Sequence, residues 1–227
     1  MTNFNFEPDD NNWDSSPNET SWSESQWRHY LRGTDKDSAR FLSIYNSIKD
    51  KPNHLDEAAS LMGWDNEDIS LTDEINVSLD EEDASLDASN SPYTLHKHPV
   101  YVVTKALYSY LNHSWEHFIK DESAAIKSSE CWALSKSLHL GEINILLSIQ
   151  ALDLGDYGLA ICHIKNSLAE LNTTLSMFNK INHADNEFLD AFISEQKIRL
   201  FDLRELWIRV MGDCRYECQR RNESDQD

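Results

Sequence analysis

This 227-residue chain is poor in the residues that form turns, with only six glycines and five prolines. A sheet protein needs turns at short intervals, so this scarcity argues against a β-rich architecture. The chain also lacks a Gly-x-Ser-x-Gly turn, a P-loop and a Gly-x-Gly-x-x-Gly fingerprint, which are the usual marks of nucleophilic catalysis and phosphate binding. We therefore expect an all-α protein, and we favour a noncatalytic one.

Closely paired cysteines are absent as well. The four cysteines, Cys131, Cys162, Cys214 and Cys218, include no Cys-x-x-Cys pair, and all four fall in stretches with a helical apolar period. Disulfide frameworks and tetrahedral zinc sites usually depend on such pairs. The pattern predicts buried, reduced thiols.

The sequence has no long apolar run. Its N-terminus lacks the positive region and the apolar region of a secretory signal. The longest mainly apolar stretch, residues 143–154, is interrupted by polar residues and is too short to span a bilayer. We expect a soluble, cytoplasmic protein without a membrane partner.

Positive charge is scarce in the first half of the chain. The formal net charge is −20, and residues 1–96 carry 21 acidic residues against six Lys and Arg, whereas residues 97–227 carry 19 against 14. A chain of this sign repels phosphate backbones, and no basic patch interleaved with aromatics occurs. Direct binding to nucleic acid is therefore not expected.

Composition divides the chain into five parts. Residues 1–20 are rich in Asn, Asp, Ser and Pro and indicate a disordered tail, whereas the apolar spacing in 21–64 predicts short helices. We expect these to be two helices separated near Gly33, followed by a third over residues 55–62. Residues 65–95 indicate an acidic linker, 96–218 a helical bundle domain and 219–227 a polar tail.

The acidic linker has a second interpretation. Residues 65–92 contain ten acidic residues and no Lys or Arg, with aliphatic residues spaced among them. Such a segment is typical of a solvated linker, but it can also fold against a basic partner. No EF-hand series can be placed on it.

The region after residue 96 has the clearest helical period. Apolar stripes predict helices over residues 99–119, 123–154, 157–181 and 187–217. Short connections between long helices favour antiparallel neighbours, so the sequence predicts an up-down bundle of about four helices. The second helix is apolar on two sides, and we expect it to be central.

Histidines and carboxylates provide an alternative function. Residues 113–117 match the His-x-x-Glu-His pattern of inverted zinc proteases, but Glu116 falls opposite the apolar stripe and the fold class is wrong for that family. A ferritin-like or related metal-binding bundle is the more reasonable form of this idea. Its candidate ligands for a transition metal are His113, His117, His139 and Glu142.

The last helix presents surplus apolar residues. Ile198, Phe201 and Ile208 point away from its main stripe and are candidate interface residues. Glu195 and Arg199, four residues apart, are expected to form an exposed or boundary ion pair.

Together these features predict a noncatalytic protein that acts through protein contacts, as an adaptor or as a homo-oligomer. No cofactor is expected beyond the transition metal of the alternative. A DNA mimic, in which carboxylates imitate phosphates, is a further alternative that the charge permits.

Overall fold

The protein is an all-α bundle with two additional helices at its N-terminal end. The computed structural model describes residues 22–64, 95–121, 126–181 and 186–224. Its elements are α1 (Glu24–Ile48), α2 (His54–Met62), the short 3₁₀ helix η2 (Leu95–Lys97), α3 (Pro99–Asp121), α4 (Ser128–Asp153), α5 (Tyr157–Lys180) and α6 (Glu187–Ser224). The predicted disordered tail (1–20) and most of the acidic linker (65–95) lie outside the described residues.

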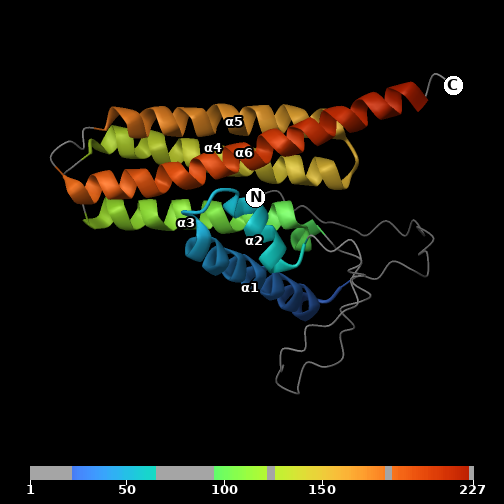
Figure 1. Ribbon diagram of the computed structural model, residues 1–227, viewed down its shortest axis with the longest axis horizontal. Helices are drawn as coiled ribbons and strands as arrows, with labels where there is room; N and C mark the ends of the chain where they lie inside the picture. Colours follow the sequence, from blue (N-terminus) through green and yellow to red (C-terminus); the bar gives the residue numbers. More distant parts are fainter. Residues whose placement is uncertain (1–21, 65–94, 122–125, 182–185, 225–227) are drawn as a thin grey trace, which may run out of the picture.

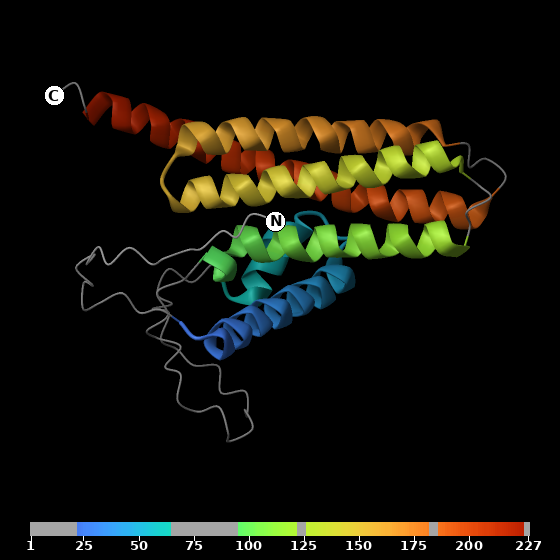
Figure 2. The ribbon, with the colours of Figure 1, turned by 180° about the vertical axis from the view of Figure 1, so that it is seen from behind.

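Helices α3 to α6 form the bundle (Figures 1 and 2). They run alternately up and down, and each packs against the next in the chain, with α6 returning to α3. The predicted up-down arrangement of four helices is confirmed. Helix α6 has 38 residues and continues past the ends of the other three.

Local sequence explains where several helices begin and end. Ser23 and Gln26 form a reciprocal capping box at the start of α1. Between α4 and α5, Gly155 has a positive φ of 71° and Asp156 accepts a hydrogen bond from the Leu159 amide at 2.9 Å. Gly63, with φ of 85°, ends α2, and its amide bonds carbonyls of the last turn.

The prediction of two helices separated near Gly33 is wrong. Helix α1 is continuous through Gly33, which faces open space. A glycine inside a helix costs only about 1 kcal/mol relative to alanine, and α1 gains more than that by burying Tyr30 before Gly33 as well as Phe41 and Tyr45 after it.

Two other boundaries differ from those expected. Helix α4 begins at Ser128 rather than near residue 123. Helix α6 continues to Ser224 instead of ending near residue 217. Arg221 accounts for part of this extension, because its guanidinium donates to the Gly155 carbonyl at 2.9 Å and lies 4.5 Å from the centre of the Tyr157 ring.

The core of the bundle contains large side chains from all four helices. Among those with less than 2% of their surface exposed are Leu107, Leu111, Leu134, Ile145, Ile164, Phe178, Ile193 and Trp207. At one end Phe118 stacks on Phe192 with ring centres 4.5 Å apart, and Trp115 stacks on Phe118. Burial of this area supplies the main stabilisation of the bundle.

Helix α4 is not central, contrary to the prediction from its two apolar sides. Helices α1 and α2 pack on the side formed by α3 and α6, away from α4 and α5 (Figures 1 and 2). The second apolar side of α4, which includes Trp132, Ile143 and Leu147, is consequently exposed in the described part of the chain.

Membrane crossing finds no support in the described helices, because none of them combines sufficient length with sufficient apolar character to traverse a bilayer.

The close contact of α4 with Tyr108 gives a first prediction. A Cβ added at Gly141 would lie 2.8 Å from the hydroxyl oxygen of Tyr108, whose side chain is only 1% exposed. We expect Gly141→Ala to lower the free energy of unfolding by about 1–3 kcal/mol, as overpacking does. Urea denaturation followed by circular dichroism measures this change.

Gly33→Ala is the matched control. The added methyl group at Gly33 meets nothing within 4 Å, so the same substitution should stabilise α1 by about 0.5–1 kcal/mol. Equal effects of the two substitutions would contradict the packing seen around Gly141.

Candidate functional site

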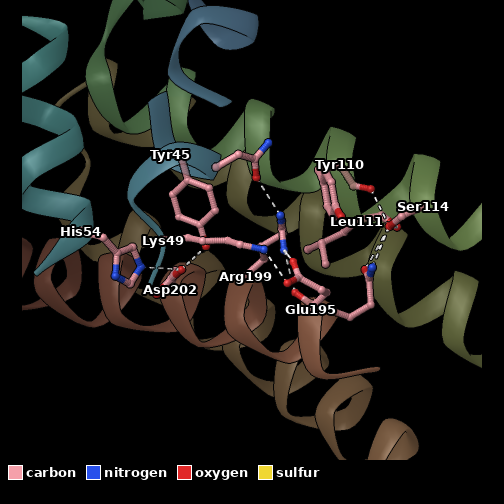
Figure 3. A network of polar contacts seen from close by, with 11 residues as sticks. Tyr45, Lys49, His54, Tyr110, Leu111, Ser114, Glu195, Arg199 and Asp202 are labelled. Atoms are coloured by element: carbon pink, nitrogen blue, oxygen red, sulfur yellow. Dashed lines mark hydrogen bonds and ion pairs between the residues drawn. The ribbon is translucent and has the colours of Figure 1, made fainter. Parts of the chain in front are cut away.

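A buried cation lies where the N-terminal helices meet the bundle (Figure 3). Arg199 of α6 is only 1% exposed. Its Nη1 donates to the Glu195 carboxylate at 2.7 Å and to the Glu195 carbonyl at 2.9 Å, and its Nη2 donates to Oδ1 of Asn46 at 2.8 Å. Its guanidinium also lies 3.7 Å from the centre of the Tyr110 ring. Arg199 thus connects α6 with both α1 and α3.

Glu195 is shared between two cations. Besides Arg199, it accepts a hydrogen bond from the ammonium group of Lys49, at the end of α1. The expected pairing of Glu195 with Arg199 is therefore present, but Arg199 is buried and the pair belongs to a network that joins three helices. Sequence spacing predicted only the contact within α6.

A second carboxylate binds both N-terminal helices. Asp202, one turn after Arg199 and 6% exposed, accepts hydrogen bonds from the Tyr45 hydroxyl of α1 and from Nε2 of His54 of α2, the latter at 2.9 Å. The other ring nitrogen of His54 lies 3.0 Å from the carbonyl oxygen of Lys51. With Asp202 ionised, the imidazole carries a proton on Nε2.

The network continues along α3 through a neutral pair. The Gln196 amide of α6 donates to Oγ of Ser114 at 2.8 Å, and Ser114 in turn bonds the carbonyls of its own helix. This pair satisfies a buried amide between α3 and α6, as interior polar groups require.

The surroundings shift the pKa of the titratable groups. Burial favours neutral imidazole, but the hydrogen bonds to Asp202 and to the Lys51 carbonyl outweigh it and raise the pKa of His54. Burial also opposes ionisation of Glu195, yet Lys49 and Arg199 lower its pKa. Burial and the hydrogen bond to Asp202 raise the pKa of Tyr45 far above its ordinary value.

This arrangement is suited to holding helices together. Each charged group has a partner from another helix, and the two N-terminal helices supply Tyr45, Asn46, Lys49 and His54. No group is left as a free base beside a nucleophile, which acid–base chemistry would require. We interpret the network as the contact that fixes α1 and α2 on the bundle.

The four candidate metal ligands do not converge. His113, His117 and His139 are exposed, and Glu142 is half-buried, where its carboxylate accepts a hydrogen bond from the Asn112 amide at 2.9 Å. Across residues 22–64, 95–121, 126–181 and 186–224, no group of three or more His, Cys, Asp or Glu side chains is arranged to hold a metal ion.

The cysteines are all free thiols. Cys131 and Cys214 are buried as predicted, and burial raises the pKa of each. Cys218 is half-buried, and the prediction of a buried thiol is wrong for Cys162, which is exposed on α5.

The candidate interface residues lie at the surface. Phe201 is 54% exposed and Ile208 is 42% exposed, whereas Ile198 is half-buried. Helices α1 and α2 contact a different face of α6, through Glu195, Asp202 and Arg209.

Cations alternate with these apolar side chains along the outer face of α6. Residues that follow one another at steps of three, four or seven lie on the same side of a helix. Five side chains of α6 are spaced in this way and lie within about 60° of one another around the helix axis. We call them the α6 face: Lys197, Phe201, Arg204, Ile208 and Arg215. Arg204 and Arg215 are exposed and form no ion pair with another described residue. Sequence reasoning found the two apolar members but did not connect them with the three cations of the same face, Lys197, Arg204 and Arg215.

Known proteins give no guide to these surfaces. Comparison with models of protein families, with curated proteins and with solved structures finds no match to this chain.

Removal of the buried guanidinium gives a second prediction. Arg199→Met keeps an apolar stem but leaves Oδ1 of Asn46 without its guanidinium donor and Glu195 with Lys49 as its remaining cation. We expect a loss of about 3 kcal/mol in the free energy of unfolding, since removing one partner of a buried charged pair has a large cost. Denaturant unfolding measures it, and hydrogen exchange of the α1 amides reports whether α1 loosens first.

Arg199→Lys is the matched control. Lysine keeps the charge but lacks the planar fork that reaches Glu195 and Asn46 together, so its loss should be smaller than that of Arg199→Met. Wild-type stability in Arg199→Met would contradict the role of Arg199 in holding the helices.

The raised pKa of His54 gives a third prediction. A folded-state pKa above the unfolded value of about 6.5 means that the contact with Asp202 favours protonated His54. Its contribution to stability is complete below the unfolded pKa and is lost as the pH rises through the folded one. Urea unfolding between pH 5 and 9, about two pH units either side of neutrality, should reveal this loss in wild type but not in His54→Gln.

Burial lowers the pKa values of His96 and His98, so these residues also contribute to the pH dependence of stability. Both are present in wild type and in His54→Gln, so the difference between the two pH profiles reports His54 alone. Identical pH profiles of wild type and His54→Gln would contradict the assignment.

Proposed function

We propose that the protein is noncatalytic and acts through contacts with other proteins, using the α6 face to bind an acidic partner segment that carries aliphatic side chains. One observation carries this proposal: the exposed side of α6 alternates Arg204 and Arg215 with Phe201 and Ile208. Cations that form no ion pair within the described part of the chain, lying beside apolar side chains, suit a ligand that combines carboxylates with aliphatic groups. Arginine and aromatic residues are also enriched where interfaces gain most of their energy.

The division of charge along the chain supports the same proposal. The described residues hold 21 acidic and 20 basic side chains, whereas the remaining residues hold 19 acidic side chains and no Lys or Arg. The helices are therefore almost neutral, and a cationic face can attract an acidic partner at close range. Residues 65–92 are themselves acidic and aliphatic, so they offer a basic partner the complementary chemistry.

The two alternatives receive less support. The metal-binding bundle would need ligands that converge, and three of its four candidates are exposed while Glu142 is already bonded to Asn112. A DNA mimic needs a dense array of carboxylates. The described helices are nearly neutral, so a DNA-mimic role would have to come from the acidic residues outside them.

Charge reversal on the α6 face gives a fourth prediction. The full-length protein, immobilised at one terminus, captures proteins from an extract of its source cells, and the captured proteins are quantified by mass spectrometry. The double variant Arg204→Glu and Arg215→Glu should lose acidic proteins that wild type retains, by about tenfold or more. The retained proteins should also dissociate as salt is added, since screening weakens such contacts.

The matched control reverses two exposed arginines of α1, Arg32→Glu and Arg40→Glu. It carries the same change in net charge and should keep the same partners as wild type. Loss of the same proteins in both variants would mean that net charge, and not the α6 face, determines binding.

A further inference from the structure

Helix α4 carries four exposed apolar side chains along its outer side, the last of them at its C-cap. Trp132 is 77% exposed and Leu154 is 82% exposed at its two ends, with Ile143 and Leu147 about 40% exposed between them. At 100° per residue the four side chains fall within about 60° of one another. This α4 stripe (Trp132, Ile143, Leu147 and Leu154) extends over about 33 Å, at 1.5 Å per residue.

The two ends of the stripe lie at equal distances from Ile143, whereas Leu147 has no apolar counterpart at position 139. Trp132 precedes Ile143 by eleven residues and Leu154 follows it by eleven, which is close to three turns in each direction. A second copy of α4 laid antiparallel on the first, related by a two-fold axis at Ile143, would place each Ile143 against its counterpart. The same axis would bring Trp132 of each copy to Leu154 of the other.

The surface beside Trp132 is hollowed. A cavity of about 310 Å³ lies between α3 and α4, lined by Ile119, Ser128, Cys131, Trp132 and Ser135. Leu154 projects from the far end of the same helix. The hollow opens toward α3, to one side of the stripe, and the two-fold relation would bring the projecting leucine of each copy to the Trp132 end of the other, twice in each pair, as an isologous interface requires.

The polar members of this surface do not oppose the pairing. Lys136, His139 and Gln150 are exposed among the apolar side chains, and no carboxylate lies on the line between Trp132 and Leu154. The two-fold relation places Lys136 opposite Gln150 and His139 opposite Leu147, so no two like charges of the helices are directly opposed. The described helices are also close to neutral.

We propose that the α4 stripe is a self-association surface at which two copies of this chain pair antiparallel about Ile143. The inference rests on the proposed role in protein contacts and assigns a second, apolar surface to a second copy. One helix pair covers less than the roughly 800 Å² per partner of a standard interface, so the dimer should be of micromolar affinity. Because each chain carries a net charge of −20, added salt should strengthen it by screening repulsion.

The test uses charge at the symmetry axis. The full-length protein and its variants are measured by sedimentation velocity over a range of concentrations. Ile143→Lys and Ile143→Glu should each weaken dimerisation by about 100-fold, since each places two like charges together in an apolar contact. An equimolar mixture of the two should associate again, because lysine then meets glutamate across the axis.

Leu159→Lys and Leu159→Glu are the matched controls, since Leu159 is 46% exposed on α5 and lies outside the stripe. They should dimerise as wild type does. Circular dichroism of every variant checks that the helices remain folded.

Three results would overturn the proposal: a wild-type protein that stays monomeric up to its solubility limit, a dimer that persists in both Ile143 variants, or a mixture that fails to associate. A dimer that dissociates in the Arg204→Glu and Arg215→Glu variant but not in Ile143→Lys would also overturn the assignment to α4, while leaving the proposed role of the α6 face intact. Conversely, failure of partner capture by α6 would not affect the dimer measurement.

Discussion

The placement of α1 and α2 on the bundle depends on the burial of the Arg199 guanidinium. A cation removed from water needs acceptors for its donors, and the bundle alone provides Glu195 and the Tyr110 ring. Within the described residues Nε of Arg199 has no hydrogen-bond partner, so the two Nη groups carry all of its hydrogen bonds. Asn46 of α1 supplies a further acceptor, and Lys49 balances the second oxygen of Glu195. Docking of α1 on α3 and α6 thus supplies Arg199 with an acceptor that replaces water. This requirement determines which side of the bundle the N-terminal helices cover.

With α1 and α2 on one side of the bundle, the α6 face and the α4 stripe remain exposed. The two surfaces differ in how a contact there should respond to salt. The α6 face interleaves cations with apolar groups, so a contact there should weaken as salt screens charge. The α4 stripe is apolar and lacks carboxylates, so a contact there between two acidic chains should strengthen with salt. One protein can therefore hold two kinds of partner at once, because α4 and α6 lie at different corners of the bundle.

The apolar period along the chain was sufficient to predict the four bundle helices and their alternating directions, because period and connection length are local properties. Gly33 misled the prediction, since tertiary burial of Tyr30 and Phe41 outweighs a local glycine. Arg199 was recognised only as the neighbour of Glu195. Its remaining partner, Asn46, lies 153 positions away and carries no signal in the sequence of α6. The metal candidates failed to converge for the same reason, as spacing within a helix says nothing of the facing helix.

The two apolar sides of α4 show how a correct local pattern led to a wrong global conclusion. Apolar residues on both sides predict that both are covered, and the prediction of a central α4 assumed that the N-terminal helices would cover the second. Arg199 and Asp202 instead hold those helices on α3 and α6. No other described helix lies over Trp132 or Leu154, which are 77% and 82% exposed and therefore open to contact with another molecule. The equal spacing of Trp132 and Leu154 about Ile143 favours a second copy, because a two-fold axis at Ile143 brings Trp132 of each copy to Leu154 of the other.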